Sequence, residues 1–136
     1  MAIKFKRKET PYVFEAINED GATCIIDANP SIGGKNKGLR PMELLASSVA
    51  GCASIDILLI LGKQKIEPTL FEIEIETKRV EETPAFFEEI KLIFKVNKEV
   101  NQEKLDRAIS LTLDKYCSVS ASLKESVQVI YEINFV

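Results

Sequence analysis

The segment PMELLASSVAGCAS, residues 41–54, decides the fold, because it opens a long and nearly all-apolar stretch of chain. Pro41 suits the first turn of a helix, where its missing N–H costs nothing, and Gly62 is typical of a helix end. Three serines and Asp56 interrupt the stretch, which argues against a membrane span. We therefore predict a helix over residues 42–61, buried on most sides.

The segments around this helix alternate apolar and polar residues, as strands do. Turn residues separate them, and the GN-rich loop at 29–38 has the composition of an exposed segment. The element order β-β-β-α-β-β-α-α-β predicts one α+β domain over residues 1–136, with antiparallel sheets. The predicted elements besides the central helix are strands at 3–7, 12–18, 22–28, 70–82, 86–96 and 126–136, an amphipathic helix at 101–116, and a short helix from Cys117 or Ser118.

Composition excludes several classes of function. The net charge of −3 gives no basic surface for nucleic acid, and the N-terminus has no apolar segment of a secretory signal, so we expect a cytoplasmic protein. The chain has 3 cysteines and no histidine. This excludes Cys-His and Ser-His catalytic pairs and every histidine-ligated metal site. We expect no metal and no cofactor, so any chemistry must come from thiols, carboxylates and cations.

The cysteines differ in their surroundings. Cys52 lies in the central helix, where a cysteine is most often a small core residue, although its small neighbours would also let a ligand or another backbone approach. Cys117 lies near a predicted helix start, where unpaired N–H groups favour a thiolate and lower the pKa. Cys24 lies within a predicted strand, and we interpret it as structural.

The pattern G-x-R-P-M-E-L-L-x(6)-G-C-x-S-x-D over residues 38–56, followed by Y-C-S-V-S at 116–120, resembles the OsmC/Ohr family of osmotically inducible and organic hydroperoxide resistance proteins. It is most similar to the YhfA-like branch of predicted redox proteins. The resemblance implies an OsmC-like fold, with sheets packed around a long central helix in an intertwined homodimer. The active sites would then lie at the subunit interface.

The resemblance also implies a chemistry. Cys52 would attack a hydroperoxide, and Cys117 would condense with the resulting sulfenic acid to form a disulfide. An external dithiol would then restore both thiols. The substrate expected from the apolar surroundings is an alkyl hydroperoxide, and the residues expected on the substrate side are Arg40, Met42, Glu43 and Asp56.

The sequence departs from the peroxidase members at the pair that supports the thiolate. Their glutamate directly follows the proline, where this chain has Met42, and Glu43 lies on the opposite helix face from Cys52. No arginine of this chain matches, by motif, the arginine that supports the thiolate in the peroxidase members. The available cations are Arg7 and Arg40. Asp56 lies one turn beyond Cys52, and its charge would raise the pKa of that thiol; it could equally cap a backbone group or pair across the dimer.

Three hypotheses therefore stay open. The first is a thiol-dependent hydroperoxide reductase. The second is a noncatalytic dimer of the same fold that binds a small apolar or acyl ligand, which the missing Glu-Arg pair favours. The third is a redox sensor whose disulfide changes a partner surface. All three predict a dimer, because 136 residues supply too few other elements to cover an apolar helix on every side.

Overall fold

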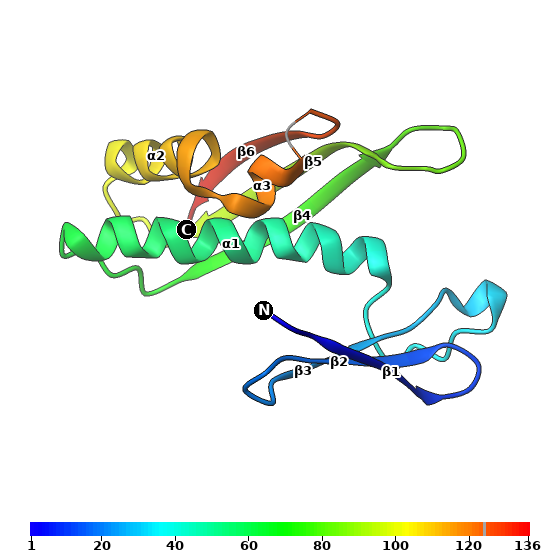
Figure 1. Cartoon of the computed structure of the whole chain (residues 1–136). Helices are drawn as coiled ribbons and strands as arrows, with labels where there is room; N and C mark the ends of the chain where they lie inside the picture. Colours follow the sequence, from blue (N-terminus) through cyan, green and yellow to red (C-terminus); the bar gives the residue numbers. More distant parts are fainter. Residues whose placement is uncertain (124) are drawn as a thin grey trace. The chain divides into compact units, whose positions relative to one another are not determined.

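The computed structural model describes residues 1–123 and 125–136 (Figure 1). It confirms the α+β class with a long helix between two small sheets along the chain. Two compact units are present, Met1–Leu45 and Ala46–Val136, and each is described by itself. The prediction of one domain over the whole chain stays a prediction. The elements in order are β1 (Lys4–Glu9), β2 (Val13–Ile17), β3 (Thr23–Ile26), η1 (Pro30–Ile32), α1 (Pro41–Lys63), β4 (Phe71–Arg79), β5 (Phe87–Val96), α2 (Gln102–Leu111), η2 (Thr112–Tyr116), α3 (Ser118–Leu123) and β6 (Gln128–Phe135).

The N-terminal unit is the predicted antiparallel meander, in the order β1-β2-β3. Its core is small. Among residues 1–45, all of which the structure describes, the buried apolar side chains are Val13 and Ile26. Phe5 stacks on Phe14 with ring centroids 5.0 Å apart, yet Phe5 is still 59% exposed. A sheet with so little buried apolar surface is marginal by itself.

Asp27 organises the loop that leads from β3 to α1. Its buried carboxylate accepts hydrogen bonds from the backbone N–H groups of Ala28, Lys35 and Lys37. These bonds hold the pKa of Asp27 below its usual value, the bond from Lys35 having the largest effect. Gly38 is required here, because an added Cβ would lie 2.4 Å from the carbonyl oxygen of Ile25.

The C-terminal unit contains a mixed sheet in the order β4-β5-β6. The predicted hairpin of β4 and β5 is antiparallel, but β6 pairs with β5 in parallel, so the prediction of wholly antiparallel sheets is wrong. The physical reason is the long connection through α2, η2 and α3, which returns the chain to the sheet edge in the same direction.

The two faces of this sheet differ in character. One face carries a charged ladder that includes the ion pair of Lys91 with Glu132 at 2.8 Å. The other face is apolar, with Leu92 and Phe94 fully buried. The helix α2 packs there, and the Tyr131 hydroxyl on β6 donates a hydrogen bond to the Asp106 carboxylate at 2.8 Å.

The helix α1 is longer and less covered than predicted. It runs through Gly62 to Lys63 and ends in a turn with Lys65 at φ +57°, where the Ile66 N–H bonds the Leu61 carbonyl at 2.9 Å. The prediction that Gly62 ends the helix is therefore wrong.

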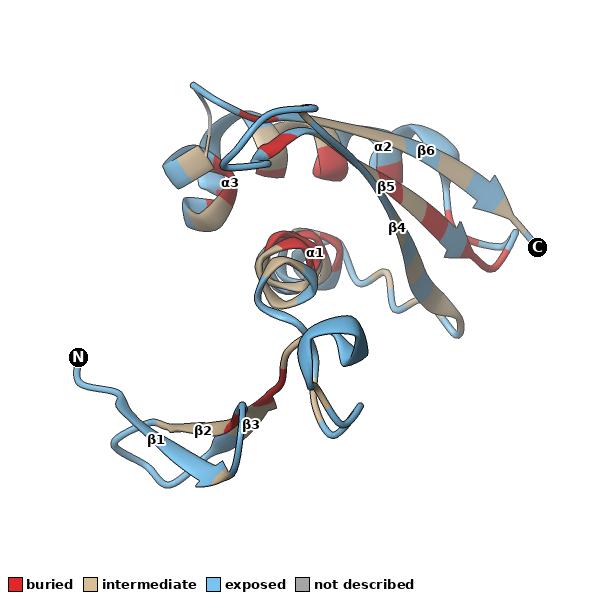
Figure 2. Ribbon diagram, turned by 90° about the vertical axis from the view of Figure 1, so that its right-hand side faces the viewer, coloured by how far each residue is buried: buried red, intermediate tan, exposed pale blue. Residues whose placement is uncertain are grey.

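The buried residues of α1 form one stripe, on the side that faces the rest of the C-terminal unit (Figure 2). Ile55 is 64% exposed and Leu59 is 58% exposed. Within one chain the helix is thus not buried on most sides, because one sheet and two short helices cover only part of its circumference. The stripe consists of Ala46, Val49, Ala50, Ala53, Ile57 and Leu61.

Candidate functional site

Cys52 and Cys117 meet in the C-terminal unit, although they are far apart in the sequence. Cys52 is half-buried on α1, and Cys117 is buried, with 2% of its surface exposed. The two thiols are near enough to interact, because the neighbouring Cys52 side chain is one of the causes that raise the pKa of Cys117, and both thiols are free. The fold therefore places two reduced thiols close to each other. Cys24 lies elsewhere, in β3 of the N-terminal unit.

A change of helix type positions Cys117. The helix α2 ends at Leu111 and continues as the π-helix η2, whose last bond joins the Cys117 N–H to the Thr112 carbonyl at 2.8 Å. Cys117 itself is extended, and α3 begins at Ser118. This confirms the prediction of a helix start at Cys117 or Ser118. The sequence did not predict the π-helix, a feature often found at functional sites.

The buried side chains of this segment also differ from the predicted ones. A regular spacing of four from Leu105 and Ile109 predicts Leu113 as the next core residue. In the structure Thr112 is fully buried instead, whereas Leu113 is half-buried. The hydroxyl oxygen of Thr112 has no hydrogen-bond partner within residues 1–123 and 125–136. Sequence reasoning had no signal for this residue, because a threonine within a helical pattern usually faces solvent.

The Cys117 thiol is held mainly in its neutral form. Burial raises its pKa to about 11, the hydrogen bond from the Ser120 N–H at 3.4 Å partly opposes this, and the contact with Cys52 raises it further. The prediction of a lowered pKa is therefore wrong. The expected backbone donor is present, but a helix of only six residues supplies less stabilisation of a thiolate than burial removes.

A cavity of about 200 Å³ reaches Cys117 from η2, α3 and β6. Its wall is partly apolar, with Leu113 from η2, Ala121 from α3 and Val129 from β6, and partly polar, with the oppositely charged Asp114 and Lys115. Cys52 does not line this cavity. The two cysteines are thus neighbours, and of the two only Cys117 lines the cavity.

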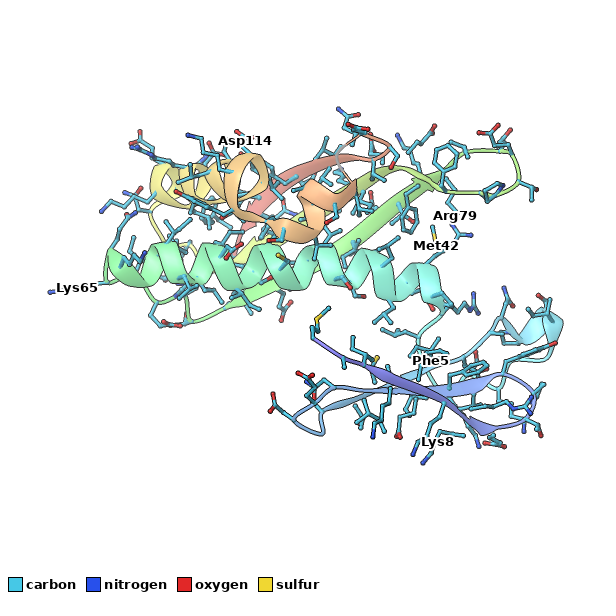
Figure 3. The ribbon with its side chains drawn as sticks, in the orientation of Figure 1. Phe5, Lys8, Met42, Lys65, Arg79 and Asp114 are labelled. Carbon is cyan, nitrogen blue, oxygen red and sulfur yellow. The ribbon has the colours of Figure 1, made fainter. Side chains whose placement is uncertain are left out.

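Three of the residues predicted on the substrate side belong to the start of α1 and to the N-terminal unit. The Arg40 N–H donates a hydrogen bond to the Glu43 carboxylate at 2.9 Å, and the Leu44 N–H bonds the Arg40 carbonyl at 2.9 Å. Glu43 is therefore a helix cap. Met42 is half-buried in the first turn (Figure 3). The predicted substrate contacts of Arg40, Met42 and Glu43 stay predictions.

Asp56 is half-buried on α1, one turn beyond Cys52. Among the residues that the structure describes, its carboxylate makes no ion pair or hydrogen bond, so the predicted backbone cap is not formed within one chain. Its predicted role near the substrate stays a prediction. Among the residues that the structure describes, no three cysteine, aspartate or glutamate side chains lie together as possible metal ligands.

The chain is similar in sequence and in fold to known proteins. The chain is 30% identical over 117 residues to the protein YhfA of Escherichia coli K12, covering 85% of this chain and 84% of YhfA. A hypothetical protein from Aquifex aeolicus has a solved structure that is 28% identical, with a TM-score of 0.77, and the alignment covers 100% of this chain and 98% of that one.

The organic hydroperoxide resistance protein OhrB of Bacillus subtilis shares the fold at 18% identity, with a TM-score of 0.69 and 98% of each chain covered. Residues 34–132 match the protein family described as OsmC-like protein. This match includes both cysteines of the neighbouring pair and most of the chain, so the protein belongs to the OsmC-like family.

Proposed function

We propose that this protein is a thiol-dependent peroxidase that reduces organic hydroperoxides, with Cys52 as the attacking thiol and Cys117 as the resolving thiol. The observation that carries the proposal is the proximity of the two thiols, which interact with each other, because neighbouring cysteines can form a disulfide. The fold that this chain shares with OhrB of Bacillus subtilis, a protein named for organic hydroperoxide resistance, also supports the proposal.

Exposure and charge state assign the two roles. Cys52 is half-buried, whereas Cys117 has 2% exposure, so Cys52 is the more accessible of the two to a substrate. The pKa of Cys117, raised to about 11 by burial, leaves it almost entirely protonated at neutral pH. Since a thiolate is the attacking species in peroxide reduction, Cys117 is unsuited to the first step.

The reaction is balanced by these two thiols and an external dithiol. The Cys52 thiolate attacks the distal peroxide oxygen, the O–O bond breaks, and the alkoxide leaves as the alcohol after taking a proton. Cys52 is then a sulfenic acid. The Cys117 sulfur attacks the Cys52 sulfur, hydroxide leaves and becomes water, and a disulfide remains. The dithiol reduces this disulfide and becomes a cyclic disulfide itself.

The proposal includes a homodimer. Gly51, Ile55 and Leu59 lie at a spacing of four on the exposed face of α1, and an added Cβ at Gly51 would meet nothing within 4 Å. By length and composition the helix α1 is apolar enough to cross a membrane. One-third of its most apolar window is buried within the chain. We propose that a second copy covers this face and the poorly buried sheet of the N-terminal unit, and that the protein works in the cytoplasm.

A turnover assay tests the proposed activity. We expect cumene hydroperoxide to be consumed in the presence of dithiothreitol, and Cys52→Ser to abolish this consumption. Cys24→Ser is the matched control and should keep full activity, because Cys24 lies in β3 and not at the cysteine pair. Failure to consume the hydroperoxide with any of several dithiols, or full activity in Cys52→Ser, would refute the proposal.

One observation favours a second function, noncatalytic binding of a small apolar or acyl ligand. Glu43 is engaged as a helix cap, so it is not free to hold an arginine beside the thiolate. Native mass spectrometry of freshly purified protein would detect a retained ligand. A ligand retained by a protein that consumes no hydroperoxide would establish this function in place of the first.

A further inference from the structure

We infer that the thiol that reduces the Cys52–Cys117 disulfide enters the cavity between η2, α3 and β6 and attacks the sulfur of Cys117. This inference rests on the proposed function and deepens it, because it assigns the route and the target atom of the reductant. The attacking sulfur bonds to the Cys117 sulfur, the bond between the two cysteines breaks, and its electron pair leaves on Cys52.

Access is the first argument for this assignment. Cys117 has 2% exposure, so a reagent can approach its sulfur only through a defined opening. The cavity of about 200 Å³ supplies that opening, and Cys117 contributes to its wall while Cys52 does not. This volume lies below the range of about 300–1,000 Å³ typical of sites for drug-sized ligands. It admits a small thiol and excludes the surface of a folded protein.

The direction of attack is the second argument. A thiolate must approach a disulfide sulfur from the side opposite the sulfur that leaves. A cavity that is lined by Cys117 and not by Cys52 favours an approach to the sulfur of Cys117. The remaining wall is compatible with this reagent, since Leu113 and Ala121 offer apolar surface and the opposite charges of Asp114 and Lys115 balance each other.

The leaving group supplies independent support. Attack at Cys52 would expel Cys117 as a buried thiolate, and burial raises the pKa of Cys117 to about 11. Thiols of high pKa leave slowly in disulfide exchange. In the assigned direction Cys117 stays covalently bound in the first step. It is released only in the second step, when the other thiol of the dithiol attacks the mixed disulfide from within the same molecule and Cys117 takes a proton.

The position of the mixed disulfide tests the inference. The purified protein is oxidised with diamide, which forms the disulfide without any hydroperoxide, and is exposed briefly to the monothiol 2-mercaptoethanol. Acid stops exchange, the denatured free thiols are alkylated, and peptides are identified by mass spectrometry. We expect the mercaptoethanol adduct on Cys117 and the alkyl group on Cys52 at the earliest times. An equal or larger adduct on Cys52 would overturn the inference.

A variant that narrows the cavity tests the route. Ala121→Leu adds side-chain volume to the cavity wall, while Ser122→Leu adds the same leucine one residue further along α3, at an exposed residue that does not line the cavity. We expect Ala121→Leu to slow reduction of the disulfide by about tenfold or more, because exchange depends on access to the sulfur. Formation of the disulfide by diamide should keep its rate. Equal reduction rates in the two variants would contradict the assigned route.

The two proposals fail in different ways. A chain that forms the disulfide with diamide but consumes no hydroperoxide refutes the peroxidase, and the position of the adduct then still decides which sulfur is attacked. A chain that consumes hydroperoxide but carries the adduct on Cys52 refutes the route alone. Failure of diamide to form a disulfide between Cys52 and Cys117 refutes this inference directly.

Discussion

The backbone N–H of Arg40 donates a hydrogen bond to the carboxylate of Glu43 at 2.9 Å, so the glutamate closes the first turn of α1. This contact occupies the acidic residue that would otherwise be available to support a thiolate at Cys52. Glu43 also complements the positive end of the helix dipole. In the described structure Glu43 therefore stabilises the helix start. Its mutation should lower the stability of the protein and leave the rate of the reaction nearly unchanged.

We expect Glu43→Ala to destabilise the protein by about 1 kcal/mol, because one helix N–H loses its acceptor. Glu43→Gln keeps an oxygen acceptor and should lose less. Urea unfolding measures both, and the rate of hydroperoxide consumption should stay within about twofold of wild type, since the cap does not touch the thiols. A large loss of activity with unchanged stability would show that Glu43 acts in the reaction.

The second prediction concerns Cys117→Ser. Without the resolving thiol, the sulfenic acid on Cys52 persists and meets further hydroperoxide, which oxidises it to sulfinic acid. When excess hydroperoxide is added without any dithiol, which would itself reduce the sulfenic acid, we expect the added oxygen atoms on Cys52 by mass spectrometry. Cys24→Ser, the matched control, should form the Cys52–Cys117 disulfide and resist this oxidation. Sustained turnover by Cys117→Ser would show that the resolving thiol lies elsewhere.

The raised pKa of Cys117 predicts a dependence of stability on pH. Burial raises this pKa from its ordinary value of 9.0 to about 11, so between these values the folded chain holds a proton that the unfolded chain has released. Stability from this thiol is complete below pH 9 and is lost as the pH rises toward 11. Tyr131, whose pKa burial raises to about 12, adds a loss of the same sign at higher pH.

Thermal unfolding at several pH values measures this effect. The decrease in melting temperature between pH 9 and 11 should be smaller in Cys117→Ala than in wild type, because alanine has no proton to lose. Cys24→Ala is the control and should keep the wild-type slope. An identical slope in Cys117→Ala and wild type would contradict a buried, neutral thiol at this position.

The buried hydroxyl of Thr112 gives a prediction of opposite sign. It has no hydrogen-bond partner in the part of the chain that the structure describes, and an unsatisfied buried hydroxyl costs about 1–3 kcal/mol. Thr112→Val replaces the hydroxyl with a methyl group of similar shape, so we expect stability to increase by about 1 kcal/mol. Thr77→Val, at an exposed residue of β4, is the control. A destabilised Thr112→Val variant would indicate a bound water or another partner.

The sequence predicted the element order, and the structure places Cys52 and Cys117 close together, but the local geometry around them was not predicted. Alternation of apolar residues identified the strands, and the resemblance to a family paired Cys52 with Cys117. The parallel pairing of β6 with β5 could not be read from alternation, because both pairings bury every second residue. It depends on the length of the connection through α2 and α3 and on where that connection returns the chain.

The charge state of Cys117 was the main error of sequence reasoning. A helix start was predicted correctly beside this residue, and its N–H donor is present, but the pKa depends on burial that no local pattern reveals. The π-helix η2 was missed for the same reason, because no local sequence pattern reveals it. It changes the spacing of the turn before Cys117, where Leu113 lines the cavity, and only tertiary packing determines this local geometry.

The last prediction concerns the exposed face of α1. Ile55 is 64% exposed and lies one turn from Gly51, whose surroundings are open in the single chain. If a second copy covers this face, Ile55→Glu buries a carboxylate against an apolar surface, and we expect the protein to become monomeric with a mass near 15.2 kDa by light scattering. Lys63→Glu, exposed at the end of the same helix, should leave the wild-type dimer intact. A wild-type chain that is already monomeric would remove the dimer from the proposal, whereas an Ile55→Glu variant that stays dimeric would place the interface on another surface.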